Sequence, residues 1–273
     1  MDQLTGKVVM VTGAGSGIGK ASAAGFVTRG ARVILVGRRQ SVLDDVAKTL
    51  RKNGGEVWAC AVDISKKEEI STLVAWVNKE LGGVDILVNN AGSASKTLNA
   101  RWIEEEEWDE VQDINMKAVF LLTQALLPTM LARKNGTIIT VSSLAALRPN
   151  LLGGAAYGAA KAAARNFMTY LHNTFRNDGI RATCILPGEV NTPIMDNRAS
   201  PPTQAIRDRM VQPEEVAEAI LLCAGLPPRT VIEELIVAPT FLRDVSADIE
   251  VSRWKNAPAD CATEHESHQK GEL

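Results

Sequence analysis

Short apolar runs alternate with longer amphipathic stretches along almost the whole chain, and this alternation constrains the fold more than any other feature. The short runs are rich in β-branched residues, which favours strands, whereas the longer stretches repeat apolar residues at helical spacing. Strands are therefore predicted at 8–11, 32–36, 57–62, 85–88, 137–141, 181–186 and 235–237. Helices are predicted at 20–29, 42–53, 67–81, 108–132, 156–177 and 213–224.

The predicted strands, such as VVMV and TIITV, are apolar on both faces, which is typical of a parallel sheet covered by helices on each side. Because strands and helices alternate, each connection is expected to be a right-handed crossover. We therefore expect an α/β fold with a doubly wound (Rossmann-type), mostly parallel seven-stranded sheet. A single domain over 1–256 is predicted, followed by a polar, flexible tail over 257–273.

Composition argues against several classes of partner. The 273 residues carry a net charge of −2, so no overall field attracts nucleic acid or an anionic membrane surface. No apolar run approaches the ~20 residues of a membrane span, and the N-terminus lacks a signal-peptide pattern. The four cysteines lie far apart without a CxxC pair, as in a reduced cytoplasmic protein. We expect a cytoplasmic protein whose partner is a small molecule.

A glycine-rich turn, TGAGSGIG, directly follows the first predicted strand and precedes a helix. Such a turn lets main-chain N–H groups approach a pyrophosphate at the positive end of the helix. Glycines alone are weak evidence, since many turns need them, but the strand–turn–helix context favours a dinucleotide site. The residues predicted to form it are Thr12, Gly13, Gly15, Ser16, Gly17, Ile18 and Gly19.

The end of the second strand indicates which dinucleotide binds. A carboxylate at this place accepts from the ribose 2′-OH of NAD, whereas an arginine neutralises the 2′-phosphate of NADP. Here Gly37 takes the usual acidic place and Arg38 and Arg39 follow. Arginine can hold a phosphate through two charge-assisted hydrogen bonds, although a solvated surface pair is the alternative. We predict NADP(H), with Arg38 as the main contact because it comes first.

Tyr157 and Lys161 stand four residues apart in a helical segment, so both side chains share one helix face. A neighbouring ammonium favours the phenolate and brings the phenol closer to the range of a proton carrier at neutral pH. A packing tyrosine beside a solvated lysine is the alternative. Two observations argue against it: the chain has only two tyrosines, and alanine and glycine surround this one.

Two serines end the fifth predicted strand, just before the helix that carries the tyrosine. A serine at the carboxyl end of a central parallel strand lies at the crevice where ligands bind in such sheets. Its hydroxyl can donate to a carbonyl oxygen that gains negative charge during reaction.

The motifs TGAGSGIG, GRR, DI, NNAG, N, SS, YGAAK and PGEVNT occur in this order between about residues 5 and 240. In this order and at these strand ends the chain resembles the short-chain dehydrogenase/reductase family. The resemblance implies Ser143 as the serine of the pair that acts, with Ser142 structural. It implies catalytic roles for Tyr157 and Lys161, and for Asn115 as the residue that holds a water beside the lysine.

The resemblance also extends the expected cofactor site. Asp63 and Ile64 would contact the adenine. Asn90 would brace the sheet while Ala91 and Gly92 pass the ribose. The remaining expected contacts, beside the nicotinamide, are Tyr157, Lys161, Pro187, Gly188, Val190 and Thr192.

The implied activity is hydride transfer between NADP(H) and a ketone, aldehyde or alcohol, without a metal. A substrate lid is expected at about 190–212. The expected pocket residues are mostly small and apolar, which favours a neutral, apolar substrate: Ser93, Ala94, Ala145, Leu147, Leu152, Gly154, Gly188 and Met195. A non-catalytic NADP(H)-binding regulator and an epimerase on the same fold are the alternatives. The family's helix contacts imply a homodimer or homotetramer.

The C-terminal part departs from the family pattern. Many members end in a VDGG-like turn, whereas here Val237 is followed by Ala238, Pro239 and Thr240 and then by some 30 residues. Cys261, His265 and His268 have a spacing that could suit zinc, but a polar tail without a scaffold is the more common reading. No metal site is therefore predicted.

Overall fold

The structure, a computed structural model, describes residues 3–261 and 264. Seven parallel strands form one sheet in the order β3-β2-β1-β4-β5-β6-β7, which confirms the predicted doubly wound α/β fold. Each predicted strand matches an observed one to within one residue at either end. The strands are β1 (Val8–Thr12), β2 (Arg32–Gly37), β3 (Val57–Ala61), β4 (Ile86–Asn89), β5 (Gly136–Val141), β6 (Ile180–Pro187) and β7 (Glu234–Val237).

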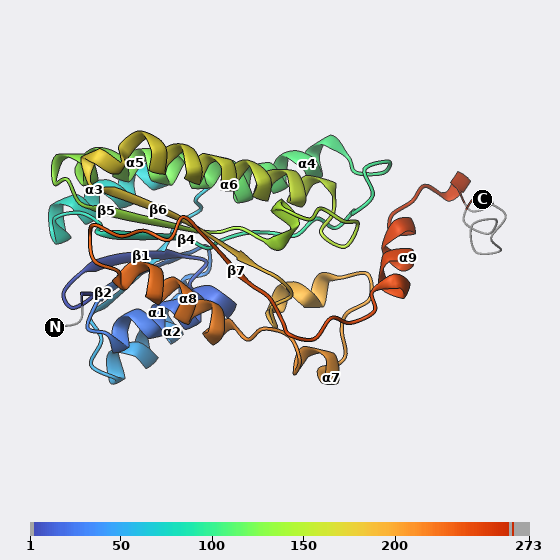
Figure 1. Ribbon diagram of the computed structural model, residues 1–273, viewed down its shortest axis with the longest axis horizontal. Coiled ribbons are helices and arrows are strands. Elements are labelled where there is room, and N and C mark those ends of the chain that lie inside the picture. Colours follow the sequence, from blue (N-terminus) through green and yellow to red (C-terminus); the bar gives the residue numbers. More distant parts are fainter. Residues whose placement is uncertain (1–2, 262–263, 265–273) are drawn as a thin grey trace.

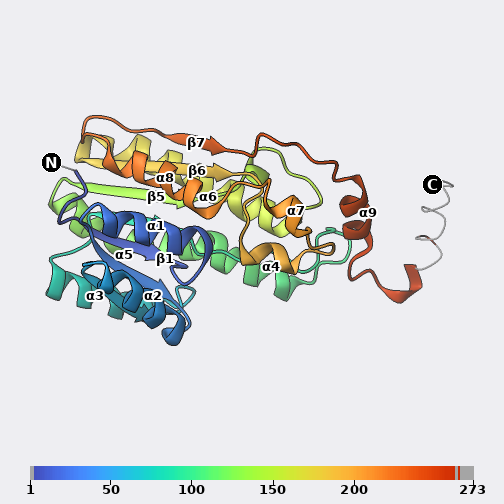
Figure 2. The same cartoon turned by 90° about the horizontal axis from the view of Figure 1, so that it is seen from below.

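Helices cover both faces of the sheet (Figures 1 and 2). Helices α3, α5 and α6 lie on one face, whereas α1, α2 and α8 lie on the other. The helices are α1 (Gly17–Thr28), α2 (Gln40–Lys52), α3 (Lys67–Leu81), α4 (Glu105–Gln112), α5 (Ala118–Ala132), α6 (Ala155–Phe175), α7 (Gln204–Arg207), α8 (Pro213–Gly225) and α9 (Ser246–Trp254).

The alternation of side chains along each strand divides the core into two apolar layers. In β1, Val9 and Val11 pack with the layer under α1, α2 and α8. Val8 and Met10 of the same strand pack with the opposite layer. All four are buried, so the strand is apolar on both faces as a central parallel strand must be.

The helix predicted at 108–132 is interrupted, and the interruption has a local cause. Between α4 and α5 the chain makes a π-helical turn over Asp113–Lys117. The Asn115 side chain lies inside this turn and donates from Nδ2 to the main-chain oxygen of Val111 at 2.9 Å. This bond competes with the regular helix ladder, which is how asparagine disturbs a helix.

The whole stretch Glu105–Ala132 spans 28 residues and is long and apolar enough to cross a membrane on length and composition alone. In this fold its second part, α5, packs against the sheet as part of the core. Leu122, Leu126 and Met130 of α5 are fully buried in the layer that also contains α3 and the sheet. The stretch is therefore the core helix of an α/β sheet.

Three short elements beyond the carboxyl edge of the sheet were not predicted from the sequence. A 3₁₀ turn (Pro193–Asn197) and α7 lie in the segment between β6 and α8, and α9 follows β7. Figure 1 shows α7 and α9 at the same end of the molecule, outside the layered body. Each element is short, so its apolar periodicity is too weak to indicate a helix.

Candidate active site

The carboxyl edge of the sheet brings most of the predicted site residues together. The strand register pairs Val141 of β5 with Ile185 of β6, and Pro187 of β6 with Val237 of β7. Ser143 lies two residues after Val141, and Pro187 lies two residues after Ile185. The two residues therefore reach the same height at the carboxyl edge of the sheet. The loops after β1 and β4 leave the same edge, where ligands bind in doubly wound sheets.

The glycine-rich turn after β1 depends on its glycines. Gly13 and Gly17 have φ angles of +65° and +50°, which side chains rarely tolerate. A Cβ atom on Gly19 would lie 2.4 Å from the Gly13 oxygen and 2.5 Å from Nδ2 of Asn90. The Ser16 side chain caps no N–H of α1 among the described residues. The first-turn N–H groups therefore suit an anion.

Two predicted residues hold this turn against the loop after β4. Thr12 Oγ1 accepts hydrogen bonds from the main-chain N–H groups of Asn90 at 2.9 Å and Ala91 at 3.0 Å. In return, Asn90 Nδ2 donates to the main-chain oxygen of Thr12 at 2.9 Å. The two motifs are thus fixed to each other by hydrogen bonds between side chains and main chain. The other predicted residues are close by in sequence: Gly15 and Ile18 beside the turn, and Gly92 after Ala91.

Arg38 and Arg39 follow β2 and are exposed. Asp63, which follows β3, accepts from Oγ and N of Ser65 at 2.7 and 3.0 Å. These bonds lower the pKa of the Asp63 carboxyl, and the charges of Lys66 and Arg38 lower it further. The N-cap residue of α3 is Lys66, which leaves Asp63 and the buried Ile64 at the carboxyl edge.

Lys161 is buried, with 4% of its surface exposed, although lysine rarely is. Its Nζ lies 5.5 Å from the centre of the Tyr157 ring and donates to the main-chain oxygen of Val141 at 3.0 Å. Burial lowers the pKa of the ammonium to about 8. Ser142 donates to the main-chain oxygen of Lys161 at 2.8 Å, which ties α6 to β5.

Tyr157 faces Ser143 across the start of α6. Burial raises the pKa of the phenol, whereas a hydrogen bond from Ser143 and the charge of Arg198 lower it. Ser143 Oγ also accepts from the main-chain N–H of Ala145 at 3.1 Å, which fixes the position of this oxygen. The predicted serine, tyrosine and lysine therefore form one cluster.

Asn115 joins the cluster from the π-helical turn and is fully buried. Its Nδ2 donates to the main-chain oxygens of Ser93 and Val111, both at 2.9 Å. Its Oδ1 has no hydrogen-bond partner among the described residues. A Cβ atom on Gly92 would lie 2.8 Å from this Oδ1 and 3.3 Å from Nζ of Lys161, so the asparagine and the lysine converge on Gly92.

The loop after β6 approaches the glycine-rich turn from the opposite side. The Gly188 main chain donates to β7 at 2.8 Å, and Val190 forms an isolated parallel bridge with Val211. A Cβ atom on Gly17 would lie 3.0 Å from Cγ2 of Thr192. The two loops therefore enclose the space expected for the pyrophosphate and the nicotinamide.

A chain of four charged side chains at this end was not predicted. Glu189 accepts from Arg198 at 2.6 Å and from Nε and Nη2 of Arg243 at 2.9 Å each, and Arg243 also donates to Asp248. Burial opposes ionisation of Glu189, but the bonds from the two arginines outweigh it and lower its pKa. The partners stand 9 and 54 residues from Glu189, so no local sequence pattern could have indicated them.

The C-terminal segment (residues 241–261) closes the same end. It carries α9 and is attached both to the loop after β4 and to the segment between β6 and α8. The attachment consists of the stacked rings of Trp102 and Trp254, 6.2 Å apart, and of hydrogen bonds from Trp102 Nε1 to Arg253 O (3.1 Å), from Asn256 Nδ2 to Thr97 Oγ1 (3.0 Å) and from Lys255 Nζ to Asn197 O (3.1 Å).

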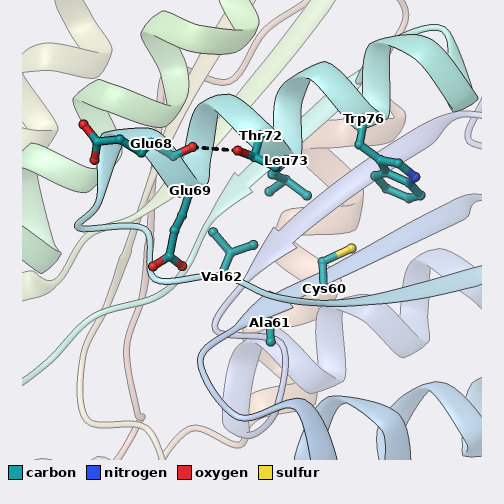
Figure 3. Close-up of a pocket in the computed structure, with 8 residues that line it drawn as sticks. All are labelled: Cys60, Ala61, Val62, Glu68, Glu69, Thr72, Leu73 and Trp76. Atoms are coloured by element: carbon teal, nitrogen blue, oxygen red, sulfur yellow. Dashed lines mark hydrogen bonds between the residues drawn. The ribbon is translucent and has the colours of Figure 1, made fainter.

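Two pockets lie beside the helices. The larger, of about 470 Å³, lies between β3 and α3 (Figure 3) and contains Cys60, Leu73 and Trp76 among its walls. The smaller, of about 380 Å³, lies between α1 and α8. Neither contains the cluster around Tyr157.

Across residues 3–261 and 264, no three His, Cys, Asp or Glu side chains gather as a metal site requires. Of the tail residues weighed as zinc ligands, Cys261 is half-buried. His265 and His268 lie outside the described residues.

Comparisons with known proteins agree with this geometry. The family model for short chain dehydrogenases matches residues 7–202. An uncharacterized oxidoreductase of Staphylococcus aureus (strain USA300) is 34% identical over 239 residues, covering 88% of this chain and all of the relative.

Two solved structures show the same fold with a cofactor present. L-sorbose reductase from Gluconobacter frateurii, in complex with NADPH and L-sorbose, has a TM-score of 0.80 and 32% identity, covering 87% of this chain and 97% of that one. A metagenomic short-chain oxidoreductase in complex with NADP has a TM-score of 0.76 and 33% identity, covering 88% and 100%. The chain therefore belongs to the short-chain dehydrogenase/reductase family, and it is an oxidoreductase with a nicotinamide cofactor.

Proposed function

We propose that this protein transfers hydride between NADP(H) and a carbonyl compound or its secondary alcohol. The observation that carries the proposal is the buried Lys161 ammonium, 5.5 Å from the centre of the Tyr157 ring, together with Ser143, which lowers the pKa of that phenol. Burying an ammonium group costs free energy, and such groups occur mainly at functional sites. Here it lies where it can stabilise a phenolate.

The cofactor fits the residues that are present. The positive-φ glycines let the glycine-rich turn approach Asn90, Ala91 and Thr192 closely, where a Cβ atom would collide, and Ser16 leaves the first N–H groups of α1 without a side-chain cap. Exposed Arg38 and Arg39 suit a 2′-phosphate, and the two related structures described above contain NADP or NADPH. We therefore propose NADP(H) rather than NAD(H), held by the glycine-rich turn, Arg38, Asp63 and the loop from Pro187 to Thr192.

The bound nicotinamide supplies or accepts the hydride. During reduction Ser143 and Tyr157 hold the carbonyl oxygen, and their hydroxyls stabilise the charge that develops on it. Tyr157 then donates its proton to that oxygen, while the Lys161 charge stabilises the phenolate that remains. Asn115 Oδ1, which lies near Lys161 and lacks a partner among the described residues, is placed to hold a water that returns the proton.

A panel of ketones and aldehydes, followed by NADPH absorbance, tests this proposal. Tyr157→Phe should lower kcat/KM about 10³-fold because the proton donor is lost while the ring remains. The chain's other tyrosine, Tyr170, is exposed, so Tyr170→Phe is the matched control. Tight NADPH binding without consumption across the panel would favour a regulatory protein, and isomerised product without net NADPH loss would favour an epimerase.

Association and location are further proposals. Phe120 on α5 and Tyr170 on α6 are 38% and 55% exposed, which supports a homodimer or homotetramer formed through these helices. Gel filtration with light scattering tests it, and a monomer at micromolar concentration would contradict it. We also propose a cytoplasmic location, which cell fractionation tests.

A further inference from the structure

We propose that Arg198 selects substrates that carry a carboxylate, so that the substrates are oxo acids and the corresponding hydroxy acids. This inference rests on the proposed function and names its substrate class. It replaces the neutral, apolar substrate expected from the sequence. That expectation counted the small apolar walls but could not include a cation contributed by the lid.

Four charged side chains in this region form a row of ion pairs in which negative and positive groups alternate. Asp248 contacts Arg243, Arg243 contacts Glu189, and Glu189 contacts Arg198. Arg243 binds the Glu189 carboxylate through two nitrogens, at 2.9 Å each. The carboxylate is therefore already satisfied by a planar guanidinium, which is the strongest geometry for such a pair. Arg198 is the last side chain of this row of ion pairs, and it is a cation.

Arg198 keeps donors for a further acceptor. Of the five N–H groups of its guanidinium, one bond is recorded among the described residues, from Nη1 to Glu189. The side chain is 20% exposed, so it is mostly withdrawn from water but still reachable. A carboxylate bound here would continue the alternation of sign and would use the remaining donors in pairs.

The position of Arg198 suits a group close to the reacting carbonyl. Glu189 follows Pro187 by two residues, and Pro187 stands level with Ser143 across β5 and β6. The Arg198 guanidinium lies 2.6 Å from the Glu189 carboxylate and therefore close to the end of β6. In agreement with this place, its charge lowers the pKa of the Tyr157 phenol. Arg148, in the segment between β5 and α6, is exposed. Arg198 is therefore the cation that this proposal assigns to the substrate.

The C-terminal segment supports this arrangement. Arg243, which binds Glu189, belongs to this segment, and Lys255 donates to the main-chain oxygen of Asn197, next to Arg198. The same segment is fixed to Trp102 in the loop after β4. Glu189 and Arg198 are therefore held in place by contacts outside their own loop.

Acetoacetate and methyl acetoacetate, reduced with NADPH, form a matched pair that differs in one charge. The wild-type protein should prefer the acid at least 10-fold in kcat/KM. Arg198→Met should lower the acid-to-ester ratio about 10- to 100-fold, as expected for a charge-assisted contact. Arg198→Lys retains the charge but not the planar guanidinium that can make two parallel hydrogen bonds, so it should lower the ratio about 3- to 10-fold. Arg29→Met, which removes an arginine–glutamate pair on the far side of α1, should leave the ratio unchanged.

A preference for the ester, or an unchanged ratio in Arg198→Met, would overturn the inference while leaving the reductase intact. If neither compound nor any ketone consumes NADPH, the proposed function fails instead. A second measurement then still decides about Arg198. Without cofactor, 3-hydroxybutyrate should raise the Tm of the wild type but not of Arg198→Met. An equal shift in both, or none in the wild type, counts against the site.

Discussion

The two ends of the carboxyl edge are held together by different interactions. At the end with the glycine-rich turn, the short side chains of Thr12 and Asn90 each bond to the main chain of the other loop, and Gly19 allows the close approach. At the other end, Glu189 and Arg243 join segments 54 residues apart through long charged side chains. The first end is thus built from short contacts that involve the main chain, whereas the second depends on pairs of long side chains that single substitutions can change.

The largest effect is expected where the backbone has no spare room. In Gly19→Ala the new methyl group would lie within 2.5 Å of both the Gly13 oxygen and Asn90. Neither atom can move without breaking the contact between the two loops, so unfolding should become easier by about 3 kcal/mol. NADPH affinity should fall more than about 100-fold in titrations followed by fluorescence. Gly54→Ala, where a Cβ meets open space, is the control; its own φ of +83° limits it to a smaller loss.

The second prediction separates stability from catalysis at Lys161. Its pKa falls from 10.5 to about 8 in the fold, so holding the ammonium costs about 3 kcal/mol at pH 7. Lys161→Met removes that cost but leaves the Val141 oxygen without its donor, which costs about 1 kcal/mol. The variant should be about 2 kcal/mol more stable in urea unfolding at pH 7, yet inactive.

The free energy of unfolding should also depend on pH through Lys161. Between pH 8 and 9.5 the unfolded chain keeps a proton that the folded lysine loses, so wild-type stability should rise with pH in this window. Below pH 8 the folded lysine carries its proton, so the full free-energy cost of burying the ammonium is present. Lys161→Met should lack the rise, and exposed Lys48→Met should retain it. A flat wild-type profile would contradict the burial of the charge.

The third prediction concerns cofactor choice. Arg38→Ser removes the expected partner of the 2′-phosphate, so the KM for NADPH should rise about 10- to 100-fold and the KM for NADH less than about 3-fold. Arg39→Ser is the paired control, with a smaller expected change. Equal changes for both cofactors would show that Arg38 does not read the phosphate.

The smallest effect is expected where the C-terminal segment is attached. Trp254→Ala removes the stacking on Trp102, worth about 1 kcal/mol. The KM for the carbonyl substrate should rise about 3- to 10-fold with the KM for NADPH unchanged. Trp76→Ala removes a comparable ring pair with Trp58 at the far edge of the sheet, and it should lower Tm without altering carbonyl kinetics. Similar kinetics in both variants would argue against a substrate role for α9.

The contrast between the two ends also explains how far sequence reasoning reached. The strands, the glycine-rich turn and the Tyr157–Lys161 spacing follow from local patterns, because each is determined within one or two turns of chain. The interruption at Asn115 was expected only through the family resemblance. Arg198 and Arg243 could not be predicted, because their roles depend on partners that only tertiary packing brings near.

Attachment of α9 after the last strand has a consequence for the diversification of such enzymes. A recombination event downstream of β7 would exchange the segment that carries α9 while every strand-to-strand pairing stayed intact. New chemistry could thus be explored at the terminus without endangering the scaffold's ability to assemble. By the same logic, an affinity handle fused to this terminus is a poor choice for kinetic work, and one placed before β1 is the better one.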